Sequence, residues 1–284
     1  MKNNLIRMAK NKVINGSRYM LVQKLPGLFP FYLVTEYPKS GGTWLGQLIS
    51  GYFDIPFPRN TYPKFGMSLV HGHFLPSSRS DKIKKILWLV RDGRDVIVSS
   101  YYYYLFPTDK NLRNPKNHLY FSSRLRFDEV ENIKENLPKY IEFMFTHKPG
   151  RIVRFGHEGD WVSFNRKWLS FLGEPDKGGN LIKTSYEALL KDTGNELSRI
   201  VSLMTGSDPE LRRINEIVEQ FSFKRQTGRN HGEEDKHSFL RKGISGDWKN
   251  YFSPEAAEIF DHYAGDMLME LGYESGREWV AGVK

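Results

Sequence analysis

Cysteine is absent from this chain of 284 residues. Without a thiol, the protein can form no disulfide bond, no thiolate nucleophile and no cysteine-ligated metal site. The fold must therefore depend on a hydrophobic core and on hydrogen bonds. A chain without disulfides suits a reducing compartment, and we expect a cytoplasmic protein.

Long hydrophobic runs are also missing. No stretch approaches the roughly 18 consecutive apolar residues that a membrane-spanning helix needs. The first 17 residues are polar and basic, with no apolar segment of signal-peptide length. We therefore expect no membrane span.

Acidic side chains are outnumbered, with 33 Asp and Glu against 42 Lys and Arg, which gives a net charge of +9. A surface of this sign attracts anions, and these include nucleic acid, acidic membranes and phosphorylated cofactors. Charge alone does not choose among them.

The chain has the composition of a globular α/β protein, with 39% hydrophobic and 14% aromatic residues. Its apolar runs predict short buried strands, which alternate with segments of helical periodicity, and this alternation indicates a central parallel β-sheet flanked by helices. We expect a single domain over 1–284, with 1–27 as an N-terminal extension and the polar segment 107–138 as a surface excursion or lid. The expected strands are 31–34, 68–71, 86–90 and 180–185, and the expected helices are 43–49, 92–104, 161–172, 197–204, 209–219 and 254–271.

A glycine-containing loop lies between the first expected strand and its helix. At such a place backbone N–H groups and the helix dipole form an anion site, and a lysine and two hydroxyls would strengthen it. The candidate phosphate-binding residues are Lys39, Ser40, Gly41, Gly42, Thr43 and Trp44.

A nucleoside-triphosphate loop is the alternative interpretation. Its lysine follows the glycines, whereas Lys39 precedes Gly41 and Gly42, and this order weighs against an ATP-dependent kinase. A nucleic-acid-binding protein is the second alternative. The basic residues, however, are spaced in loops after strands and do not form one tract with interleaved aromatics.

The loop resembles the Tyr-Pro-Lys-Ser-Gly-Thr-Thr-Trp phosphosulfate loop of the cytosolic sulfotransferases that use 3′-phosphoadenosine 5′-phosphosulfate (PAPS). Only Gly42 differs from that motif. Two further motifs are similar to the family's segments around the 3′-phosphate, namely Leu-Val-Arg-Asp-Gly-Arg-Asp with its downstream serine, and Arg-Lys-Gly-Ile-Ser-Gly-Asp-Trp-Lys-Asn. The resemblance implies that the 3′-phosphate is bound by Arg91, Ser99, Arg241, Lys242 and Gly243.

The same resemblance implies a sulfotransferase fold, akin to that of nucleotide kinases, and an adenine site beside Tyr186 and Phe223, with Trp44 able to stack on the base. At Phe221 the family has a threonine. Near 249–258, Ser253 and Pro254 replace the Thr-Val pair of the family's dimerisation motif, so the sequence leaves the oligomeric state open.

A histidine segment follows the second expected strand. In the register of the family, His73 is the catalytic base and His71 replaces a lysine near the sulfuryl group, but the inserted Phe74 also permits the register in which His71 is the base. An imidazole suits proton abstraction near neutral pH, and of the two histidines we favour His73. The resemblance assigns Lys39 to the bridging oxygen of the leaving phosphate.

The implied reaction transfers the sulfuryl group of PAPS to a hydroxyl or amine of a small-molecule, lipid or carbohydrate acceptor, and 3′,5′-adenosine diphosphate (PAP) is the second product. No metal is part of this scheme. His231 and His237 flank acidic residues at a spacing that matches no tight metal site. The candidates to line an acceptor pocket are Tyr101 to Tyr104, Phe106 and the polar segment 107–138, although the tyrosines equally suit a packed core. The sequence does not identify the acceptor.

Overall fold

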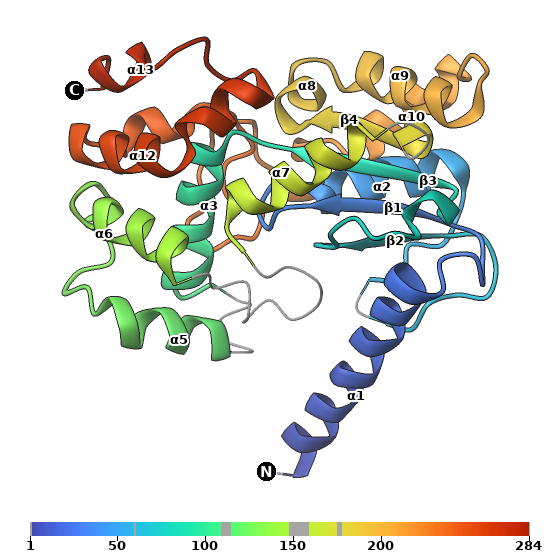
Figure 1. The fold of residues 1–284 in the computed structure, drawn as a ribbon, viewed down its shortest axis with the longest axis horizontal. Coiled ribbons are helices and arrows are strands. Elements are labelled where there is room, and N and C mark those ends of the chain that lie inside the picture. The colour runs from blue at the N-terminus through green and yellow to red at the C-terminus, as the bar shows by residue number, and fades with distance from the viewer. Residues whose placement is uncertain (1, 60, 109–114, 148–158, 175–177, 284) are drawn as a thin grey trace. The chain divides into compact units, whose positions relative to one another are not determined.

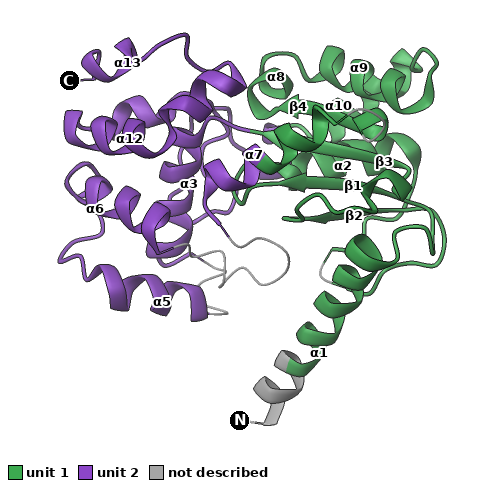
Figure 2. Ribbon diagram, viewed as in Figure 1, with its two compact units in different colours: residues 1–90, 154–157, 167–222 green, residues 91–153, 158–166, 223–284 purple. Residues whose placement is uncertain are grey.

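We describe the fold from a computed structural model of the chain. The structure describes residues 2–59, 61–108, 115–147, 159–174 and 178–283, and side chains from residue 9 onward. The chain forms two compact units (Figure 2). Unit 1 comprises residues 1–90, 154–157 and 167–222, and unit 2 comprises residues 91–153, 158–166 and 223–284.

A parallel sheet of four strands forms the centre of unit 1 (Figure 1). The strand order is β2-β1-β3-β4, and every neighbouring pair is parallel. The bounds are β1 Phe31–Glu36, β2 Ser68–Gly72, β3 Lys85–Val90 and β4 Leu181–Ser185. The confirmed α/β class follows from these short apolar runs, because a parallel strand is covered on both faces and so reads as almost continuously hydrophobic.

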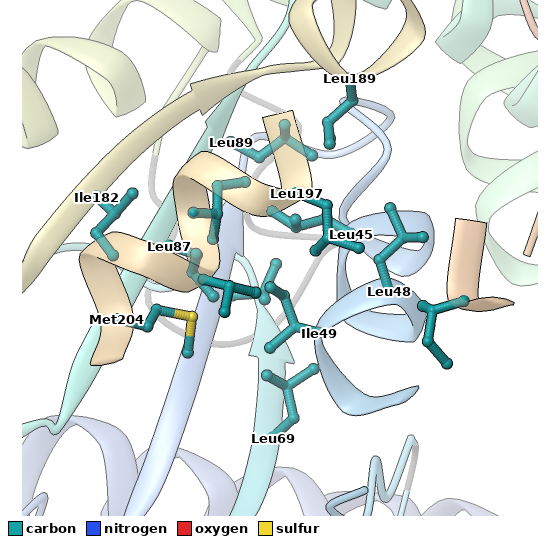
Figure 3. Packing of buried hydrophobic residues seen from close by; sticks show 14 of the residues in the cluster. Leu45, Leu48, Ile49, Leu69, Leu87, Leu89, Ile182, Leu189, Leu197 and Met204 are labelled. Carbon is teal, nitrogen blue, oxygen red and sulfur yellow. The ribbon is translucent and has the colours of Figure 1, made fainter. Parts of the chain in front are cut away.

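Both faces of the sheet are buried. On one face, Val34 and Leu87 pack with helices α2 (Gly42–Phe53), α9 (Thr193–Thr205) and α10 (Leu211–Gln220) in a cluster of apolar side chains (Figure 3). On the other, Trp88 is fully buried, and the Phe74 carbonyl accepts hydrogen bonds from Thr35 and from the Trp168 indole. This packing holds the ends of the strands in place.

The order of the strands reverses at β1, which lies between β2 and β3. In open parallel sheets, ligands bind beyond the carboxyl ends of the strands at such a switch point. The loop that follows β1 contains the candidate phosphate-binding residues. The topology therefore puts this loop where a ligand site is expected.

Helices of unit 1 surround this sheet. The 18-residue helix α1 and a single π-helical segment, η1, precede β1, and α7 begins in unit 2 and ends in unit 1. The bounds are α1 Lys2–Tyr19, η1 Met20–Lys24, α2 Gly42–Phe53, η2 Ser80–Lys82, α7 Trp161–Leu172, η4 Gly178–Asn180, α8 Tyr186–Lys191, α9 Thr193–Thr205 and α10 Leu211–Gln220.

Unit 2 is helical. Helix α12 packs against α6 and α3, and α3 also contacts α5 and η5. Ser253 caps α12 by accepting a hydrogen bond from the Ala256 amide, and Pro254 occupies the first turn, where its missing N–H costs nothing. The bounds are α3 Gly93–Leu105, α5 Lys116–Leu125, α6 Ile133–Thr146, α11 Phe223–Thr227, η5 Asp247–Asn250, α12 Pro254–Leu271 and α13 Glu278–Ala281.

The segment 107–138 was expected to be a polar lid. Its described part contains α5 and the start of α6, while residues 109–114 lie outside the described residues. Phe121 and Leu125, one helical turn apart, are buried, and Phe121 stacks on Tyr104 at 4.2 Å. A few well-spaced apolar residues therefore pack this polar stretch into the unit, and its role as a lid stays a prediction.

Tyrosines 101–104 are mainly packing residues. Tyr101, Tyr102 and Tyr104 are each 5% exposed or less, and the Tyr101 hydroxyl donates to the Val130 carbonyl. Burial raises the pKa of Tyr101 to about 12, although a hydrogen bond from Asn136 opposes the shift. These side chains stabilise unit 2, and they identify no acceptor.

Within the described ranges, no helix combines the length and the apolar character needed to cross a bilayer. In the same part of the chain, no three His, Asp or Glu side chains are grouped so that they could hold a metal ion.

Candidate active site

The phosphate loop joins β1 to α2, and its backbone is unusual. Lys39 has φ 77° and Gly41 has φ 102°, so two left-handed residues flank Ser40. Left-handed conformations are uncommon for residues other than glycine, and they concentrate at functional sites. Gly41 is the N-cap of α2, where N–H groups of the first turn point out of the helix. The loop therefore presents backbone donors at the positive end of a helix dipole.

Ser40 supplies a direct test of whether this loop suits an anion. The side chain is 1% exposed, and its Oγ atom has no hydrogen-bond partner in the structure. An unsatisfied buried hydroxyl costs roughly 1–3 kcal/mol, so such groups usually have a function. A phosphate or sulfate oxygen would accept its hydrogen bond, and the loop therefore fits a phosphosulfate group.

Trp44 and Tyr186 lie next to each other beside this loop. The Trp44 indole N–H donates to the Phe221 carbonyl at 3.0 Å, and the Trp44 and Tyr186 ring centroids are 5.9 Å apart. A Cβ atom at Gly41 would lie 2.7 Å from the Tyr186 ring. Trp44 and Tyr186, the residues of unit 1 expected beside adenine, thus lie together. At position 221, where the family has a threonine, the contact with Trp44 is made by the backbone carbonyl and so does not depend on the side chain.

Glu36, the last residue of β1, connects the loop to both candidate histidines. Its carboxylate accepts a hydrogen bond from the Gly42 amide and another from His71 Nε2, the latter at 3.0 Å. Its backbone carbonyl accepts one from His73 Nδ1 at 2.9 Å. One residue, 4% exposed, therefore organises the loop and the histidine segment.

The Glu36 carboxylate is buried, and burial alone would raise its pKa. The hydrogen bond from His71, the charges of His71 and His73 and the hydrogen bond from Gly42 outweigh burial and lower the pKa of Glu36 below its ordinary value. The group is therefore a carboxylate at neutral pH. It places a negative charge inside a loop that otherwise attracts anions.

The Glu36 carboxylate thus holds both the Gly42 amide and His71 Nε2, an arrangement that we call the Glu36 clamp. The Glu36 clamp explains the departure from the family motif at Gly42. A Cβ atom there would lie 2.5 Å from Glu36 Cδ and 2.7 Å from His71 Nε2. No side chain fits at position 42 while that pair is formed. The Gly42 amide is itself bonded to the Glu36 carboxylate.

The contacts of the two histidines distinguish their ring nitrogens. A carbonyl oxygen only accepts, so His73 Nδ1 carries the proton and, in neutral His73, Nε2 carries the lone pair. In His71 the Nε2 atom carries a proton that it donates to the Glu36 carboxylate. The geometry thus gives His73 an Nε2 atom with the character of a base.

In unit 2, Arg91 directly follows β3. Its guanidinium donates to the Ile244 carbonyl at 3.2 Å and lies 3.8 Å from the Asp95 carboxylate. Asp95 also accepts hydrogen bonds from the amides of Gly246 and Trp248. This brings Arg91 together with the 241–250 segment, as the resemblance implied. Ser99 lies on α3, one turn beyond Asp95, and is partly exposed.

Arg241 and Lys242 are both held by Asp247. Lys242 Nζ lies 2.7 Å from Asp247 Oδ1, and Arg241 bonds to Asp247 and to Glu234. Burial alone would raise the pKa of Asp247, but the hydrogen bonds from the two cations lower it. The expected phosphate ligands are therefore paired with a carboxylate that a bound phosphate would have to replace or share.

Gly243 approaches Phe223 closely. Its φ is 67°, and a Cβ atom there would lie 2.6 Å from the Phe223 ring. Phe223 is buried and stacks on His231, whose Nδ1 contacts the Gly243 carbonyl. The structure thus joins Gly243 and Phe223 in one cluster, and His231 has a structural hydrogen bond there.

Sequence reasoning missed Glu36, Asp95 and Asp247. Glu36 gave one signal, since it is an acidic residue immediately before a phosphate-loop motif. Asp95 and Asp247 stand within recognised motifs, but their spacing does not show their partners. Asp95 bonds to the amide of a residue 151 positions away, and Asp247 bonds to the ammonium group of a lysine five positions away.

The comparisons with known proteins agree with one another. The family model described as Sulfotransferase domain matches residues 59–272, which is most of the chain. Sulfotransferase 1E1 of Rattus norvegicus is 25% identical over 276 residues, covering 83% of this chain and 82% of that protein. The 3-beta-hydroxysteroid sulfotransferase of Cavia porcellus is 24% identical over 263 residues, covering 81% and 80%.

Among solved structures, mouse sulfotransferase SULT7A1, complexed with PAP, has a TM-score of 0.63. It is 21% identical in sequence, and the match covers 97% of this chain and 95% of that one. At this identity the likeness concerns the fold, and it confirms the expected sulfotransferase fold.

Proposed function

This chain belongs to the sulfotransferase family, and we propose that it transfers the sulfuryl group of PAPS to the hydroxyl of a small apolar acceptor, with His73 as the base. The observation that carries the proposal is the phosphate loop with its buried, unpartnered Ser40 hydroxyl, joined through Glu36 to His73. The donor and the class of enzyme follow from the family.

PAPS supplies an activated sulfur atom whose bond to a phosphate oxygen breaks while a bond to the acceptor oxygen forms, with PAP as the leaving group. The acceptor hydroxyl must lose its proton in this exchange. His73 Nε2 would take it, because the Glu36 carbonyl fixes the proton on Nδ1 and leaves the lone pair on Nε2.

Lys39 and Ser40 would stabilise the departing phosphate. The lysine brings a full charge, and the serine hydroxyl is already directed into a buried position, so little reorganisation is needed. Their stabilisation would grow as negative charge develops on the bridging oxygen, which is the condition for accelerating the reaction.

Glu36 would be a positioning residue, because its carboxylate accepts a hydrogen bond from His71 Nε2 at 3.0 Å and its backbone carbonyl accepts one from His73 Nδ1 at 2.9 Å. His71 stands where the family has a lysine near the sulfuryl group, and its Nε2 proton is directed to that carboxylate. The Glu36 clamp leaves His73 as the base.

In unit 2, we assign the 3′-phosphate of PAPS to Arg91, Ser99, Arg241, Lys242 and Gly243. Arg241 and Lys242 are positioned by Asp247. A bound phosphate would take over part of this pairing, which makes the affinity for PAP sensitive to substitution of Asp247.

The acceptor is the least determined part of the proposal. One of the similar proteins is named for 3-beta-hydroxysteroids, which are apolar alcohols. We propose an acceptor of this chemical class. Amines remain part of the wider proposal, as do a cytoplasmic location and the absence of a nucleic-acid function.

Transfer from radiolabelled PAPS to a panel of hydroxysteroids, phenols, long-chain alcohols and arylamines tests the proposal, with Mg-ATP as the alternative donor. We expect label in an apolar alcohol, and we expect His73→Ala to reduce transfer by about 100-fold or more while His71→Ala retains the acidic limb of the pH profile, which arises from protonation of the base. Phosphoryl transfer from ATP, or an unaffected His73→Ala enzyme, would refute it.

Glu36→Gln tests the positioning role separately. Glutamine keeps the shape and one acceptor but removes the charge beside His71. We expect kcat to fall while KM for PAPS changes little, because the charged acceptor that positions His71 and the Gly42 amide is lost. Loss of stability with an unchanged kcat would show that Glu36 is only structural.

A further inference from the structure

The protein's positive charge is concentrated at the start of the chain. Residues 1–35 contain six basic side chains and no acidic one, so they carry +6 of the net charge of +9. The basic residues are Lys2, Arg7, Lys10, Lys12, Arg18 and Lys24. Such a one-sided distribution points to an anionic partner that meets this part of the molecule.

The same segment exposes large apolar side chains. Of the eleven large hydrophobic residues that are exposed among those described, four lie between residues 13 and 28. They are Val13 at 58%, Met20 at 47%, Leu25 at 44% and Leu28 at 58%. Single exposed apolar residues are ordinary, but a cluster of them in one short segment marks an interaction site.

Lys10, Lys12 and Lys24 are exposed among these apolar residues. Val13 and Met20 are seven residues apart, which is about two helical turns and places them on the same side of the helix. We call the set of seven residues the basic apolar segment. It comprises Lys10, Lys12, Val13, Met20, Lys24, Leu25 and Leu28.

The opposite side of this segment is firmly attached to unit 1. Ile14, Leu21 and Val22 are buried, and Gln23 donates a hydrogen bond to the Leu75 carbonyl at 2.8 Å. Arg18 bonds to the His71 carbonyl. Helix α1 extends from the sheet of its unit (Figure 1). The exposed residues are therefore left over after the helix has packed.

An exposed aromatic side chain lies beside the end of the segment. Phe65 is 83% exposed, and its ring meets that of Phe29, the neighbour of Leu28, at 5.1 Å. Lys64 next to it is also exposed. The combination of lysines with aliphatic and aromatic side chains thus continues beyond the helix.

We propose that the basic apolar segment binds the surface of an anionic lipid bilayer. Apolar side chains flanked by lysines, without acidic residues, are what an interfacial segment needs to insert among acyl chains while its charges meet lipid phosphates. A second copy of the chain fits less well, because two such segments would repel each other. Nucleic acid would use the lysines but leave the aliphatic side chains without a partner.

This attachment has a consequence that rests on the proposed function. Arg18 and Gln23, on the attached side of this stretch, donate hydrogen bonds to the carbonyls of residues 71 and 75, on either side of the proposed base. The stretch of chain that binds the bilayer therefore also contacts the part of unit 1 that carries His73. An apolar acceptor dissolved in the bilayer would suit such an enzyme. Bilayer binding itself requires neither donor nor acceptor, so its failure and the failure of the proposed function are distinguishable.

Vesicle co-sedimentation of the full chain tests the proposal, with pure phosphatidylcholine vesicles compared with vesicles containing phosphatidylserine. We expect binding to the anionic vesicles that weakens with salt. Lys10→Gln with Lys12→Gln should reduce the partition coefficient roughly thirtyfold, since each lysine contributes about fivefold. Val13→Asp with Met20→Asp should reduce it by at least a similar factor. The matched controls, Lys167→Gln with Lys191→Gln and Leu203→Asp with Leu211→Asp, change exposed residues of unit 1 and should bind like the parent.

Three results would overturn the proposal. One is the absence of binding at low salt. Another is equal loss in the control variants, which would show a nonspecific charge effect. The third is evidence for a partner of another class. Oligonucleotide binding that survives the Val13→Asp and Met20→Asp changes would indicate nucleic acid. A dimer in light scattering that those changes abolish would indicate a second copy of the chain. Circular dichroism spectra and melting temperatures equal to the parent's would show that each variant is folded.

Discussion

Gly42→Ala is the substitution for which the structure gives the clearest consequence. The added methyl group would lie 2.5 Å from Glu36 Cδ and 2.7 Å from both Glu36 Oε2 and His71 Nε2, whereas ordinary contacts begin at 3.4 Å. Glu36 is buried, so the carboxylate must leave at least one of its hydrogen bonds. Overpacking of a core costs about 1–3 kcal/mol, and a hydrogen bond to a charged group contributes about 1.5–3 kcal/mol.

We therefore expect Gly42→Ala to lower the free energy of unfolding by about 2 kcal/mol or more. For a chain of this size that is a fall in melting temperature of about 4–8 °C. Gly194→Ala is the matched control, because its Cβ atom would meet nothing closer than 3.7 Å within helix α9. It should be neutral or stabilising, since alanine is the better helix former.

A double-mutant cycle with Glu36→Ala identifies the cause. If the methyl group acts by displacing the carboxylate, removing the carboxylate first should relieve most of the effect, with a coupling energy above about 1 kcal/mol. Additive effects, or a Gly42→Ala melting temperature equal to that of Gly194→Ala, would refute the Glu36 clamp. The measurement is thermal unfolding followed by far-ultraviolet circular dichroism.

Three further predictions concern other parts of the molecule. Lys39→Met should lower kcat about 100-fold or more in the radiolabel assay, because the departing phosphate loses its cation; a change confined to KM would contradict this. Asp247→Asn should lower the free energy of unfolding most at neutral pH. The lowered pKa of Asp247 means that its carboxylate stabilises the fold at pH values above the ordinary pKa of 3.8, and this stabilisation is lost as the pH falls through the folded-state pKa. An equal difference from the parent protein at neutral and acidic pH would count against the pairing with Arg241 and Lys242. Ser253→Ala should cost about 1 kcal/mol in urea unfolding through loss of the cap of α12, and a neutral result would contradict the capping role.

Much of the fold could be predicted because its signals are local. The strands of unit 1 are short apolar runs bounded by polar loops, and the observed β3, Lys85–Val90, differs by one residue from the prediction. Helix α12 begins at Pro254 and ends at Leu271 as expected, since a serine cap and a following glycine mark its ends.

The candidate site was predicted unevenly. Lys39 and Gly41 occupy the loop that their motif indicated, and the left-handed backbone at Lys39 is a property that sequence does not announce. The relation between Glu36, Gly42 and His71 could not be read from the sequence, because it depends on the parallel pairing of β1 and β2, which brings residues 35 positions apart into contact. The two departures from the family motifs, glycine at position 42 and histidine at position 71, are thus coupled through their contacts with Glu36.

The domain assignment, the residue roles and the lid stay predictions. The chain divides into two compact units, and the residues assigned to PAPS are found in both. These residues were assigned to PAPS from sequence motifs alone. The assignment is therefore tested best by a ligand whose binding should depend on the PAPS residues of unit 1 and also on those of unit 2.

Calorimetric titration with PAP is that measurement, compared with ADP, which lacks the 3′-phosphate, and with ATP. We predict tight binding of PAP alone, weakened by Lys39→Met in unit 1 and by Arg91→Ala in unit 2. Equal affinity for PAP and ADP, or a variant of either unit that binds PAP like the parent protein, would contradict it.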